Sequence, residues 1–483
     1  MATASTVTGW SPTERITSEL RQQFPQQVFE EKDSAYKSLQ DSYWSGNQKS
    51  LKPRCFFQPH STEDLAQAIA LCAKARCPFG LKSGGHGHFA GQSCLDGGVQ
   101  LDLIKLNSIS IDRSKGTVLV GSGCTWRSVY TKLQREGLIA VGGRSADVGV
   151  GGFLVGGGLS FYAARLGWGI NNVRSFEVVL GDGRIVTASR ESEPNLFRAL
   201  RGGGSNLGII TAFELETYPY SGMWGGRTLI ESQHARQAIE AYGGFVQQLK
   251  PELDPKGHTI IIFTNDEGPL QIIQYLVYTE PVADLLMFDG LRQVPTVESS
   301  LGMTDYLTLA GDIADLQHGD GDRANVATLT LKLDLELLNF AFDVYVEEAS
   351  PIAPRIRGTM EFHALPRTFS PADNVYGLDN TEGPLISFLL IFSTSLEKHN
   401  AELIATQQRI IGRVKDEAER RSLYHPFLFS NYAGEWQDVI GSYGEQNLKF
   451  LSQVAEAYDP EQVFQQLQSG SFKVSGHSRE KKL

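Results

Sequence analysis

The first half of the chain alternates short apolar segments with helical patterns. Leu65, Ile69 and Cys72 recur at helical spacing behind Ser61, a residue type that caps helices well, and Pro78 ends the pattern. The same reasoning predicts strands at residues 79–81, 99–103 and 117–120, a helix at about 125–136, and a hairpin of strands 175–180 and 184–187. Short strands between helices indicate an α+β arrangement.

The second half has longer elements and fewer glycines. Strands are predicted near residues 259–264, 270–278, 358–363 and 385–393, and helices near residues 283–291, 333–348 and 396–420. A further helix is predicted at 444–457, before the stop at Tyr458-Asp459-Pro460. We expect a sheet covered by helices, followed by a separate C-terminal segment.

The composition is that of a folded globular protein. Of the 483 residues, 41% are hydrophobic and 20% are charged, and this length predicts two or three domains. The net charge is −11 and no basic cluster precedes the last few residues, which argues against a nucleic-acid partner or a membrane surface. We expect a small-molecule partner, and the oligomeric state is left open.

Cysteine usage and the chain ends favour a cytoplasmic protein. All five cysteines precede residue 125 and form no CxxC pair, which argues against a zinc site or a disulfide framework. The N-terminus lacks the apolar segment of a secretion signal, and no run of about 18 apolar residues occurs. The end Lys481-Lys482-Leu483 differs from a peroxisomal Ser-Lys-Leu tail in its first residue, so that compartment is the alternative.

Glycine is concentrated in three runs. The chain has 50 glycines, and eight of the seventeen residues from Gly142 to Gly158 are glycine. Runs at 83–87, 149–158 and 202–204 follow short strands or helices, where glycine lets backbone N–H groups approach a phosphate. We therefore predict a nucleotide cofactor, although tight turns alone are the alternative for any single run.

The cofactor site is not of the Rossmann type. That fingerprint, G-x-G-x-x-G, requires a third glycine three residues after the second. Trp126 stands at that place after Gly121 and Gly123, and Leu154 stands there after Gly149 and Gly151. The motif therefore fails at its most specific position.

Several motifs, taken in order, resemble one flavoprotein family. They are Lys82-Ser83-Gly84-Gly85-His86, Val148-Gly149-Val150-Gly151-Gly152, Gly156-Gly157-Gly158, Leu200-Arg201-Gly202-Gly203-Gly204-Ser205-Asn206-Leu207-Gly208-Ile209-Ile210-Thr211, Asn431-Tyr432 and Tyr458-Asp459-Pro460-Glu461-Gln462-Val463-Phe464. Together they resemble the FAD-linked oxidases of the vanillyl-alcohol oxidase fold, specifically the berberine bridge enzyme-like group. The resemblance is dense over about residues 54–216 and 429–466.

The resemblance implies an α+β protein of two domains with a PCMH-type FAD-binding fold. Residues 1–216 and 429–483 would form the FAD-binding domain, and residues 217–428 an antiparallel-sheet substrate domain backed by helices. FAD would lie between the domains. The cofactor-binding residues that it implies are Ser83, Gly84, Gly85, His86, Gly87, Ser145, Asp147, Val148, Gly149, Gly151, Gly152, Gly157, Gly158, Ile209, Ile210, Asn431 and Tyr432.

The resemblance also implies that His86 bonds the flavin 8α-methyl group through its ring. The alternative is that His86 only hydrogen-bonds FAD or caps its loop. Many relatives add a second link from a cysteine at the place of Ser145, and a serine hydroxyl cannot form that thioether. We therefore expect FAD attached covalently through His86 only, which also argues against bulky oligosaccharide substrates. His88 is either a further contact or a wall residue.

Family chemistry requires a base that takes a proton from the substrate while a hydride leaves for flavin N5. The candidates are Tyr432, in a matched motif, and Tyr376 and Asp379, just before a predicted strand. A tyrosine base needs a cation or hydrogen bonds that lower its pKa from about 10. The alternative for each tyrosine is an aromatic pocket wall.

We expect a FAD-dependent oxidoreductase that acts on a small, secondary-metabolite substrate. Val148 matches the residue of the family's O2-using members, where a small side chain leaves room for O2 beside the flavin. This favours an oxidase that passes the electrons to O2 and forms H2O2. The alternatives are a dehydrogenase that does not use O2, a redox-neutral isomerase or cyclase, and a flavin-binding protein without turnover.

Overall fold

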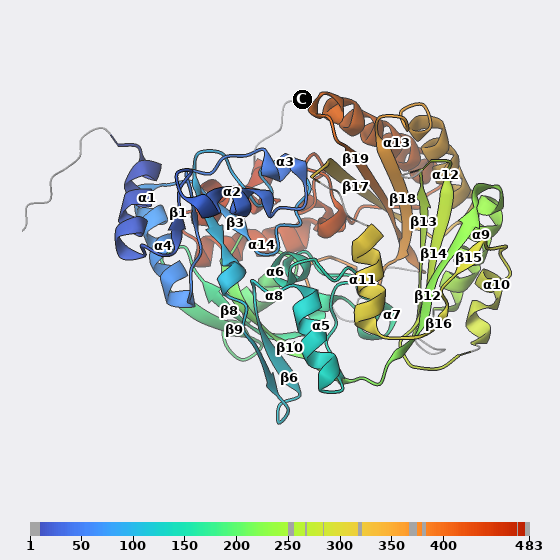
Figure 1. The fold of residues 1–483 in the computed structure, drawn as a ribbon, viewed down its shortest axis with the longest axis horizontal. Helices are drawn as coiled ribbons and strands as arrows, with labels where there is room; N and C mark the ends of the chain where they lie inside the picture. Colours follow the sequence, from blue (N-terminus) through green and yellow to red (C-terminus); the bar gives the residue numbers. More distant parts are fainter. Residues whose placement is uncertain are drawn as a thin grey trace, which may run out of the picture.

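Two lobes lie side by side in the protein (Figure 1). The computed structural model describes residues 10–249, 256–265, 268–283, 285–316, 321–366, 374–378, 383–470 and 472–478. The first lobe combines the N-terminal part of the chain with the C-terminal helices, and the second contains the segments between them (Figure 1). Within these described ranges, no helix has both the length and the apolar character needed to cross a membrane.

A small, mostly parallel sheet forms the N-terminal end of the first lobe. Its spatial order is β1 (Val28–Phe29), β2 (Cys55–Phe57), β4 (Val99–Asp102) and β3 (Phe79–Lys82). Helices α1 (Pro12–Gln23) and α4 (Thr62–Ala75) share a hydrophobic core with it. The predicted cap of α4 is confirmed, because the Ser61 Oγ accepts a hydrogen bond from the Asp64 amide at 3.1 Å. β3 delivers the chain directly into the first glycine run.

The second sheet of this lobe is antiparallel. Its spatial order is β5 (Ile109–Asp112), β6 (Thr117–Gly121), β10 (Ile209–Glu216), β8 (Val173–Val179) and β9 (Ile185–Ser189). The predicted hairpin is confirmed as the β8–β9 pair. The helices around it are α5 (Trp126–Arg135), α6 (Val150–Val155), α7 (Ala163–Leu166) and α8 (Pro194–Leu200), and a two-stranded ribbon joins β7 (Leu138–Ile139) to β11 (Tyr218–Pro219).

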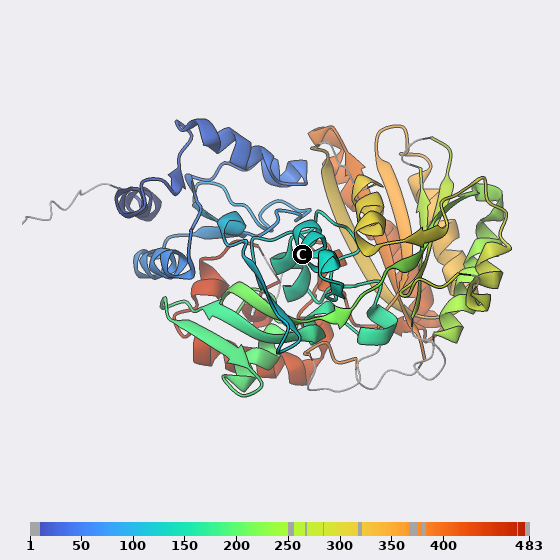
Figure 2. The same cartoon turned by 60° about the horizontal axis from the view of Figure 1, so that its bottom comes forward.

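The second lobe is built on one antiparallel sheet backed by helices, as predicted. Its spatial order is β15 (Glu298–Ser299), β12 (Met223–Glu231), β14 (Gln271–Tyr278), β13 (Gly257–Thr264), β18 (Arg357–Ala364), β19 (Leu385–Thr394), β17 (Arg323–Lys332) and β20 (Tyr424–His425), with β16 (Gly302–Thr304) paired to β12. Helices α9 (Ala235–Gln248), α12 (Leu335–Ala349) and α13 (Asn400–Arg420) pack on one face (Figure 1). The opposite face is turned toward the first lobe (Figure 2).

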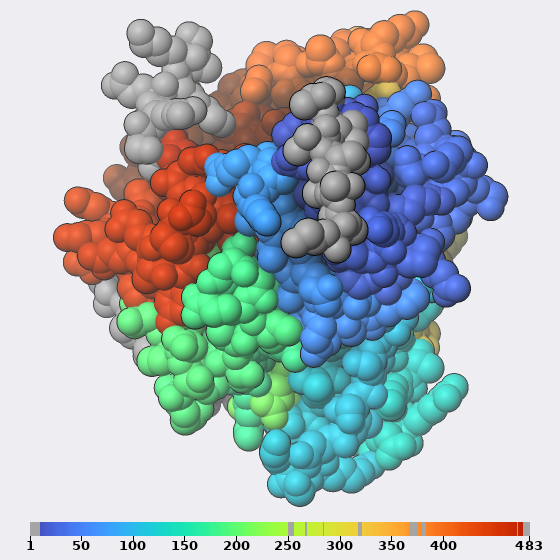
Figure 3. Space-filling view, turned by 90° about the vertical axis from the view of Figure 1, so that its left-hand side faces the viewer, coloured from blue at the N-terminus to red at the C-terminus, as the bar shows by residue number. Residues whose placement is uncertain are grey.

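The C-terminal segment returns to the first lobe. Helices α14 (Glu445–Tyr458) and α15 (Val463–Gln466) lead to Leu467, whose carbonyl accepts a hydrogen bond of 2.9 Å from the Phe79 amide of β3. The Ser469 amide donates to the Phe79 carbonyl in turn, at 2.8 Å. Figure 3 shows the result on the surface, where red C-terminal residues adjoin blue N-terminal ones. The strands of the third sheet all lie inside 217–428, while the exact domain boundary stays a prediction.

Some predicted elements differ from the observed ones. In place of the helix expected at 283–291, the described residues form a short 3-10 turn and α10 (Asp289–Arg292), and the apolar Leu286 is 82% exposed, so its burial does not stabilise a longer helix. Sequence patterns missed β12, β17, α9 and α11 (Tyr306–Leu316). In β17 the polar Thr328 interrupts the apolar pattern, yet it is buried because its hydroxyl donates to the Phe388 carbonyl of β19 at 2.9 Å.

Candidate active site

One large cavity lies between the two lobes. Its volume is about 1300 Å³. A pocket for a single drug-sized ligand has about 300–1,000 Å³, so this cavity has room for a large cofactor and a substrate together. One wall consists of the glycine runs of the first lobe, and the opposite wall is the face of the third sheet that is turned toward this lobe, from β12 to β17, together with the helix at Tyr306–Leu316.

The first two glycine runs touch each other at the cavity wall. A Cβ on Gly84 would meet the Cα of Gly149 at 2.5 Å, so both positions must lack a side chain for the two backbones to meet. Gly152 differs, because a Cβ there would meet nothing within 4 Å and the residue faces the cavity. The glycines therefore serve two purposes: some let the loops pack, and Gly152 leaves open space for a ligand.

His86 projects from the first glycine run and stacks on Trp44. The ring centroids are 4.7 Å apart and the planes differ by 17°. Among the described residues, none hydrogen-bonds the His86 imidazole. Enclosure by protein lowers its pKa to about 4, the nearby Asp147 charge opposing this shift, so the ring is neutral at pH 7 and retains a nitrogen lone pair.

The chain segment that leads into the His86 loop is fixed by buried polar contacts. Lys82, the last residue of β3, donates a hydrogen bond of 2.6 Å to the Ser42 hydroxyl and lies 3.3 Å from the Asp102 carboxylate. Both charged side chains are buried, with 2% and 0% exposure. A buried ion pair fixes its chain segments because losing either partner would leave a charge unpaired. His88 is also buried, lines the cavity, and has its pKa lowered to about 3 by burial.

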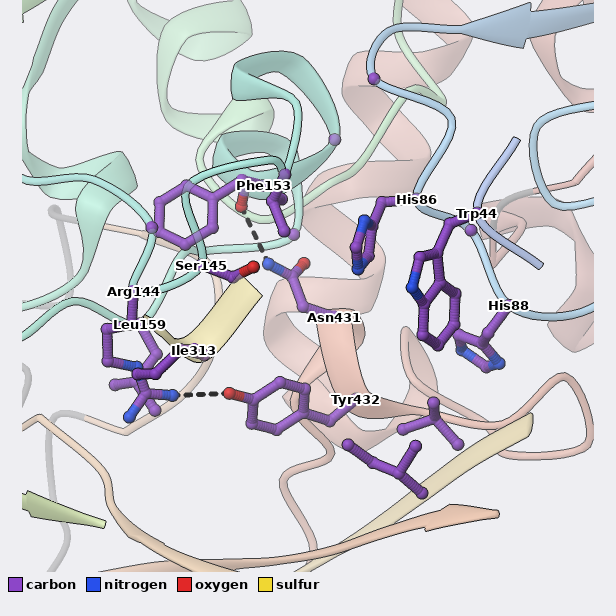
Figure 4. A pocket seen from close by; sticks show the side chains of 18 of the residues that line it. Trp44, His86, His88, Arg144, Ser145, Phe153, Leu159, Ile313, Asn431 and Tyr432 are labelled. Carbon is purple, nitrogen blue, oxygen red and sulfur yellow. Dashed lines mark hydrogen bonds between the residues drawn. The ribbon is translucent and has the colours of Figure 1, made fainter. Parts of the chain in front are cut away.

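Ser145 lines the same cavity (Figure 4). It is 7% exposed, and its hydroxyl has no hydrogen-bond partner in the described part of the chain. A buried hydroxyl without a partner is costly and uncommon. An FAD in the cavity would remove this deficit, and the open space at Gly152 and the neutral, unbonded ring of His86 are further features that fit such a cofactor. The residues present therefore fit FAD.

Arg144, immediately before Ser145, joins the two lobes by hydrogen bonds. Its Nη1 lies 3.1 Å from His258 Nε2 and 3.1 Å from His363 Nδ1, and its Nη2 donates to the Tyr432 hydroxyl at 2.6 Å (Figure 4). A guanidinium only donates, so both imidazole nitrogens accept. The proton of His363 is then on Nε2, which lies 2.8 Å from the Glu361 carboxylate.

The histidines of this cluster are neutral and the tyrosine keeps its proton. Burial, reinforced by the Arg144 charge, lowers the pKa of both His258 and His363. Enclosure raises the pKa of Tyr432, and the lowering effect of Arg144 is too small to reverse it. A tyrosine can serve as a base near neutral pH only if a cation or hydrogen bonds lower its pKa. Arg144 is such a cation beside Tyr432, yet the pKa of Tyr432 is raised overall.

The predicted site residues divide into two groups. Thirteen of the seventeen cofactor residues line the cavity, which leaves Asp147, Gly157, Gly158 and Ile209. Asp147 pairs with Arg127 on the surface, at 2.6 Å. Gly157 is covered by the Tyr376 ring, a Cβ on Gly158 would collide with Phe153, and Ile209 is fully buried in the core.

Of the two base candidates that the structure describes, Tyr432 lines the cavity and Tyr376 does not. Tyr376 is 1% exposed, lies behind Gly157 and Gly202, and packs on Trp168, so it supports the glycine runs from the core. The structure therefore does not bring Tyr376 to the reaction space, because its ring fills the room that these two glycines leave. Asp379 lies outside the described residues. Asn431 faces the cavity and donates from Nδ2 to the Phe153 carbonyl at 3.0 Å.

Sequence reasoning missed Trp44, Arg144, His258, Glu361 and His363. Arg144 stands between predicted site residues and was not singled out. Glu361 and His363 are two polar residues at a spacing of two within the apolar strand β18, which is a detectable signal for one polar face. Trp44 has no comparable signal, because only the tertiary contact with His86 shows its role.

Comparisons with known proteins agree with this site. The profile of the FAD binding domain family matches residues 53–189. The FAD-dependent monooxygenase tpcD of Cochliobolus heterostrophus is 31% identical over 91% of this chain and 88% of its own length. The FAD-dependent monooxygenase sdcF of Emericella nidulans is also 31% identical, over 91% of this chain and 94% of its own.

Solved structures share the fold at lower identity. Xylooligosaccharide oxidase of Myceliophthora thermophila superimposes with a TM-score of 0.79 at 19% identity, covering 95% of this chain and 99% of that one. Berberine bridge enzyme of Eschscholzia californica gives 0.76 at 19% identity, covering 94% and 98%. Glucooligosaccharide oxidase of Acremonium strictum, described as carrying a 6-S-cysteinyl, 8α-N1-histidyl FAD, gives 0.77 at 19%, covering 95% and 98%.

Proposed function

Because the chain belongs to the berberine bridge enzyme-like family of FAD-linked oxidoreductases, we propose that it is an oxidase of a small secondary-metabolite substrate. The observation that carries this proposal is the shared cavity, onto which His86 opens from one lobe and Tyr432 from the segment that returns to it. The cavity has room for the substrate beside the cofactor, at the face of the third sheet.

FAD is held, in this proposal, by a single covalent link through His86. Its neutral ring, stacked on Trp44 and without another hydrogen bond among the described residues, is available to form that link. Ser145 stands where a doubly attached flavin would require a thiolate, and its hydroxyl faces the cavity without reacting. The buried ion pair of Lys82 and Asp102 fixes the start of the loop that carries His86.

When bound, FAD would supply the acceptor for two electrons from the substrate, and O2 would take up these electrons with two protons to give H2O2. The chain's own residues orient the substrate and handle its proton. Tyr432 accepts a hydrogen bond from Arg144 and keeps its own proton, so its O–H can donate to a substrate oxygen. The face of β13 and β18 that lines the cavity leaves the space that such a substrate requires.

A second candidate is a monooxygenase, which the names of the closely similar fungal relatives favour. That reaction incorporates one oxygen atom of O2 into the product and reduces the other to water, so it consumes an additional reductant. An oxidase releases both atoms as H2O2 and needs no reductant other than its substrate. The two reactions therefore differ in their stoichiometry and in the source of product oxygen.

The test is anaerobic mixing of the flavin-loaded protein with a panel of small phenols, alcohols and enolisable ketones. We expect one class to bleach the flavin absorbance, and O2 added afterwards to restore it with one H2O2 per product. Product formation without net bleaching indicates a redox-neutral isomerase and contradicts the proposal. Recovery only with a dye acceptor indicates a dehydrogenase. Isotopic label transferred from O2 to the product indicates a monooxygenase.

A further inference from the structure

The Arg144 guanidinium is buried beside groups that carry no charge. The residue is 6% exposed, and its three hydrogen-bond partners are His258, His363 and Tyr432, all neutral at pH 7. Across the described ranges, no carboxylate lies within ion-pair distance of it. A buried cation is normally paired, because removing it from water is costly without an opposite charge. The positive charge of Arg144 is therefore not balanced by a negative charge among the described residues.

Two N–H groups of this guanidinium have no acceptor among the residues that the structure describes. Arginine has five N–H groups, and the contacts with the two histidines and the tyrosine use three of them. One N–H on Nε and one on Nη2 are left, and the atoms Nε and Nη2 lie along the same edge of the planar group. Such an edge binds two oxygens of a carboxylate, or the oxygen of a phenolate or enolate, with charge-assisted hydrogen bonds.

The cluster lies on the substrate side of the cavity. His258, Ile260 and Ile262 alternate along β13, and Glu361 and His363 alternate along β18, so all five share the face that is turned toward the first lobe. Tyr432 comes from the returning C-terminal segment, and its free O–H adds a third donor (Figure 4). Arg144 itself adjoins Ser145, so an oxygen bound here is held next to the proposed flavin site.

We propose that Arg144 and Tyr432 form an oxyanion site, and that the substrate carries an acidic oxygen (a phenol, an enol or a carboxylic acid) that binds in its ionised form. This inference rests on the proposed function where it calls the bound compound a substrate. The anion site itself does not depend on that function. An ionised oxygen supplies the charge that the buried guanidinium lacks. It also removes the need for a strong base, since the proton is lost before the hydride leaves.

The other charged groups around the cavity do not provide this charge. Glu361 is separated from Arg144 by the His363 ring, which it contacts at 2.8 Å. Asp312, at the rim, lies 3.8 Å from Arg227, and both side chains are more than a third exposed. The remaining rival is the cofactor itself, because a reduced flavin can carry a negative charge that Arg144 would stabilise. The test must therefore separate the substrate from the flavin.

The probes are two pairs of small aromatic compounds: 4-nitrophenol with its neutral methyl ether, and benzoate with benzamide. Each compound is titrated into oxidised, flavin-loaded protein, and binding is measured from the change in flavin absorbance. The pH is chosen so that free 4-nitrophenol is mostly neutral. We expect at least one anion to bind at least about tenfold more tightly than its neutral partner, which corresponds to about 1.4 kcal/mol. For 4-nitrophenol the bound probe should show the yellow phenolate colour.

The variants are Arg144→Gln, Arg144→Lys and the matched control Arg227→Gln, which changes an arginine that lines the same cavity from the opposite wall. Arg144→Gln should abolish the anion preference, Arg144→Lys should retain part of it, and Arg227→Gln should leave it unchanged. Flavin content and thermal unfolding are measured for each. If Arg144→Gln does not fold, Arg144→Lys against Arg227→Gln decides the question.

Two results would overturn the inference. One is equal binding of anion and neutral partner in the unmodified protein. The other is an unchanged anion preference in Arg144→Gln, and a lowered flavin reduction potential in that variant would then assign the guanidinium to the cofactor. The titrations need no turnover. Anion binding without flavin reduction by any substrate would contradict the proposed oxidase alone, and reduction by substrates without anion preference would contradict this inference alone.

Discussion

The Trp44 indole lies almost parallel to the His86 imidazole, with ring centroids 4.7 Å apart. Their backbones are joined as well, because the Trp44 amide donates to the Gly85 carbonyl at 3.0 Å. Stacking therefore fixes the orientation of a ring that a glycine loop alone would leave free to rotate. We attribute to this contact the alignment of His86 for attachment to FAD.

Replacing His86 with alanine should abolish covalent flavin. After acid precipitation and a denaturing gel, we expect flavin fluorescence in the unmodified protein and in Ser145→Ala, and none in His86→Ala. Trp44→Ala should lower the attached fraction, and Trp44→Phe should preserve most of it, because phenylalanine retains an aromatic face. Flavin that stays with the chain in His86→Ala would show that another residue forms the link.

Introducing a thiol at position 145 should restore attachment. In His86→Ala/Ser145→Cys, the cysteine would stand where the Ser145 hydroxyl faces the cavity without a hydrogen-bond partner among the described residues. We expect flavin fluorescence on the gel to return in this double variant, since a thiolate is the nucleophile that serine lacks. Fluorescence absent from the double variant, while FAD still binds reversibly, would mean that Ser145 does not adjoin the reactive flavin edge.

Alanine at two neighbouring glycines should have opposite effects on stability. In Gly156→Ala the new Cβ would overlap the Asn431 Oδ1, so Asn431 must move and its bond to the Phe153 carbonyl is lost. We expect the free energy of unfolding to fall by about 1–3 kcal/mol. In Gly152→Ala the Cβ meets nothing within 4 Å, and alanine in a helix gains about 0.5–1 kcal/mol.

Gly152→Ala should also affect FAD binding. Gly152 faces the cavity, so its Cβ would reduce the space for the cofactor, and we expect Gly152→Ala to be stable yet to bind FAD more weakly. Urea denaturation of the flavin-free protein measures stability, and the flavin content after reconstitution measures binding. Normal FAD content in Gly152→Ala would argue that the cofactor does not pass over this glycine.

The two tyrosine candidates should behave differently when replaced by phenylalanine. Tyr432→Phe removes a hydroxyl that contacts Arg144 in the cavity, and we expect flavin reduction by substrate to slow by about a hundredfold to ten-thousandfold. Tyr376→Phe removes a buried hydroxyl without a partner among the described residues, so stability should be unchanged or slightly higher and flavin reduction unaffected. Slow reduction in Tyr376→Phe would contradict its placement in the core.

Stability should fall on acidification before the carboxylates titrate. The folded protein lowers the pKa of His86 to about 4 and of His88 to about 3, from 6.5, and lowers those of His258 and His363 as well. Between pH 6.5 and 4 the unfolded chain binds protons that the folded chain does not, so acid favours unfolding and stability rises with pH.

Urea unfolding from pH 7 to pH 5 measures this effect. We expect a lower midpoint at pH 5, and a smaller change in His88→Gln, which removes one of the buried titrating groups. His234→Gln is the control, because that histidine is not buried in the core and should leave the pH dependence unchanged. A midpoint independent of pH in the unmodified protein would contradict the neutral, buried state of these histidines.

Much of the local structure could be predicted from the sequence. The cap at Ser61, the β8–β9 hairpin and the helix-backed sheet follow from turn chemistry and from periodicities of 3.6 and 2, which act over a few residues. β17 could not be found in this way, since Thr328 is polar and becomes acceptable inside the sheet only through its bond to a carbonyl 60 residues away. The helix expected at 283–291 is shorter in the structure, where the apolar Leu286 is 82% exposed and contributes little burial.

The site, too, has features that follow from local sequence and features that depend on tertiary contacts. The sequence by itself determined the glycine runs, His86 and the serine at position 145, because these depend on backbone conformation and on the chemistry of single residues. Only the tertiary structure decided that Tyr432 reaches the cavity while Tyr376 does not, and that Arg144 meets residues 114, 219 and 288 positions away. The physical reason is that charge balance and pKa depend on burial and on neighbours, and a folded chain sets both through contacts between distant segments.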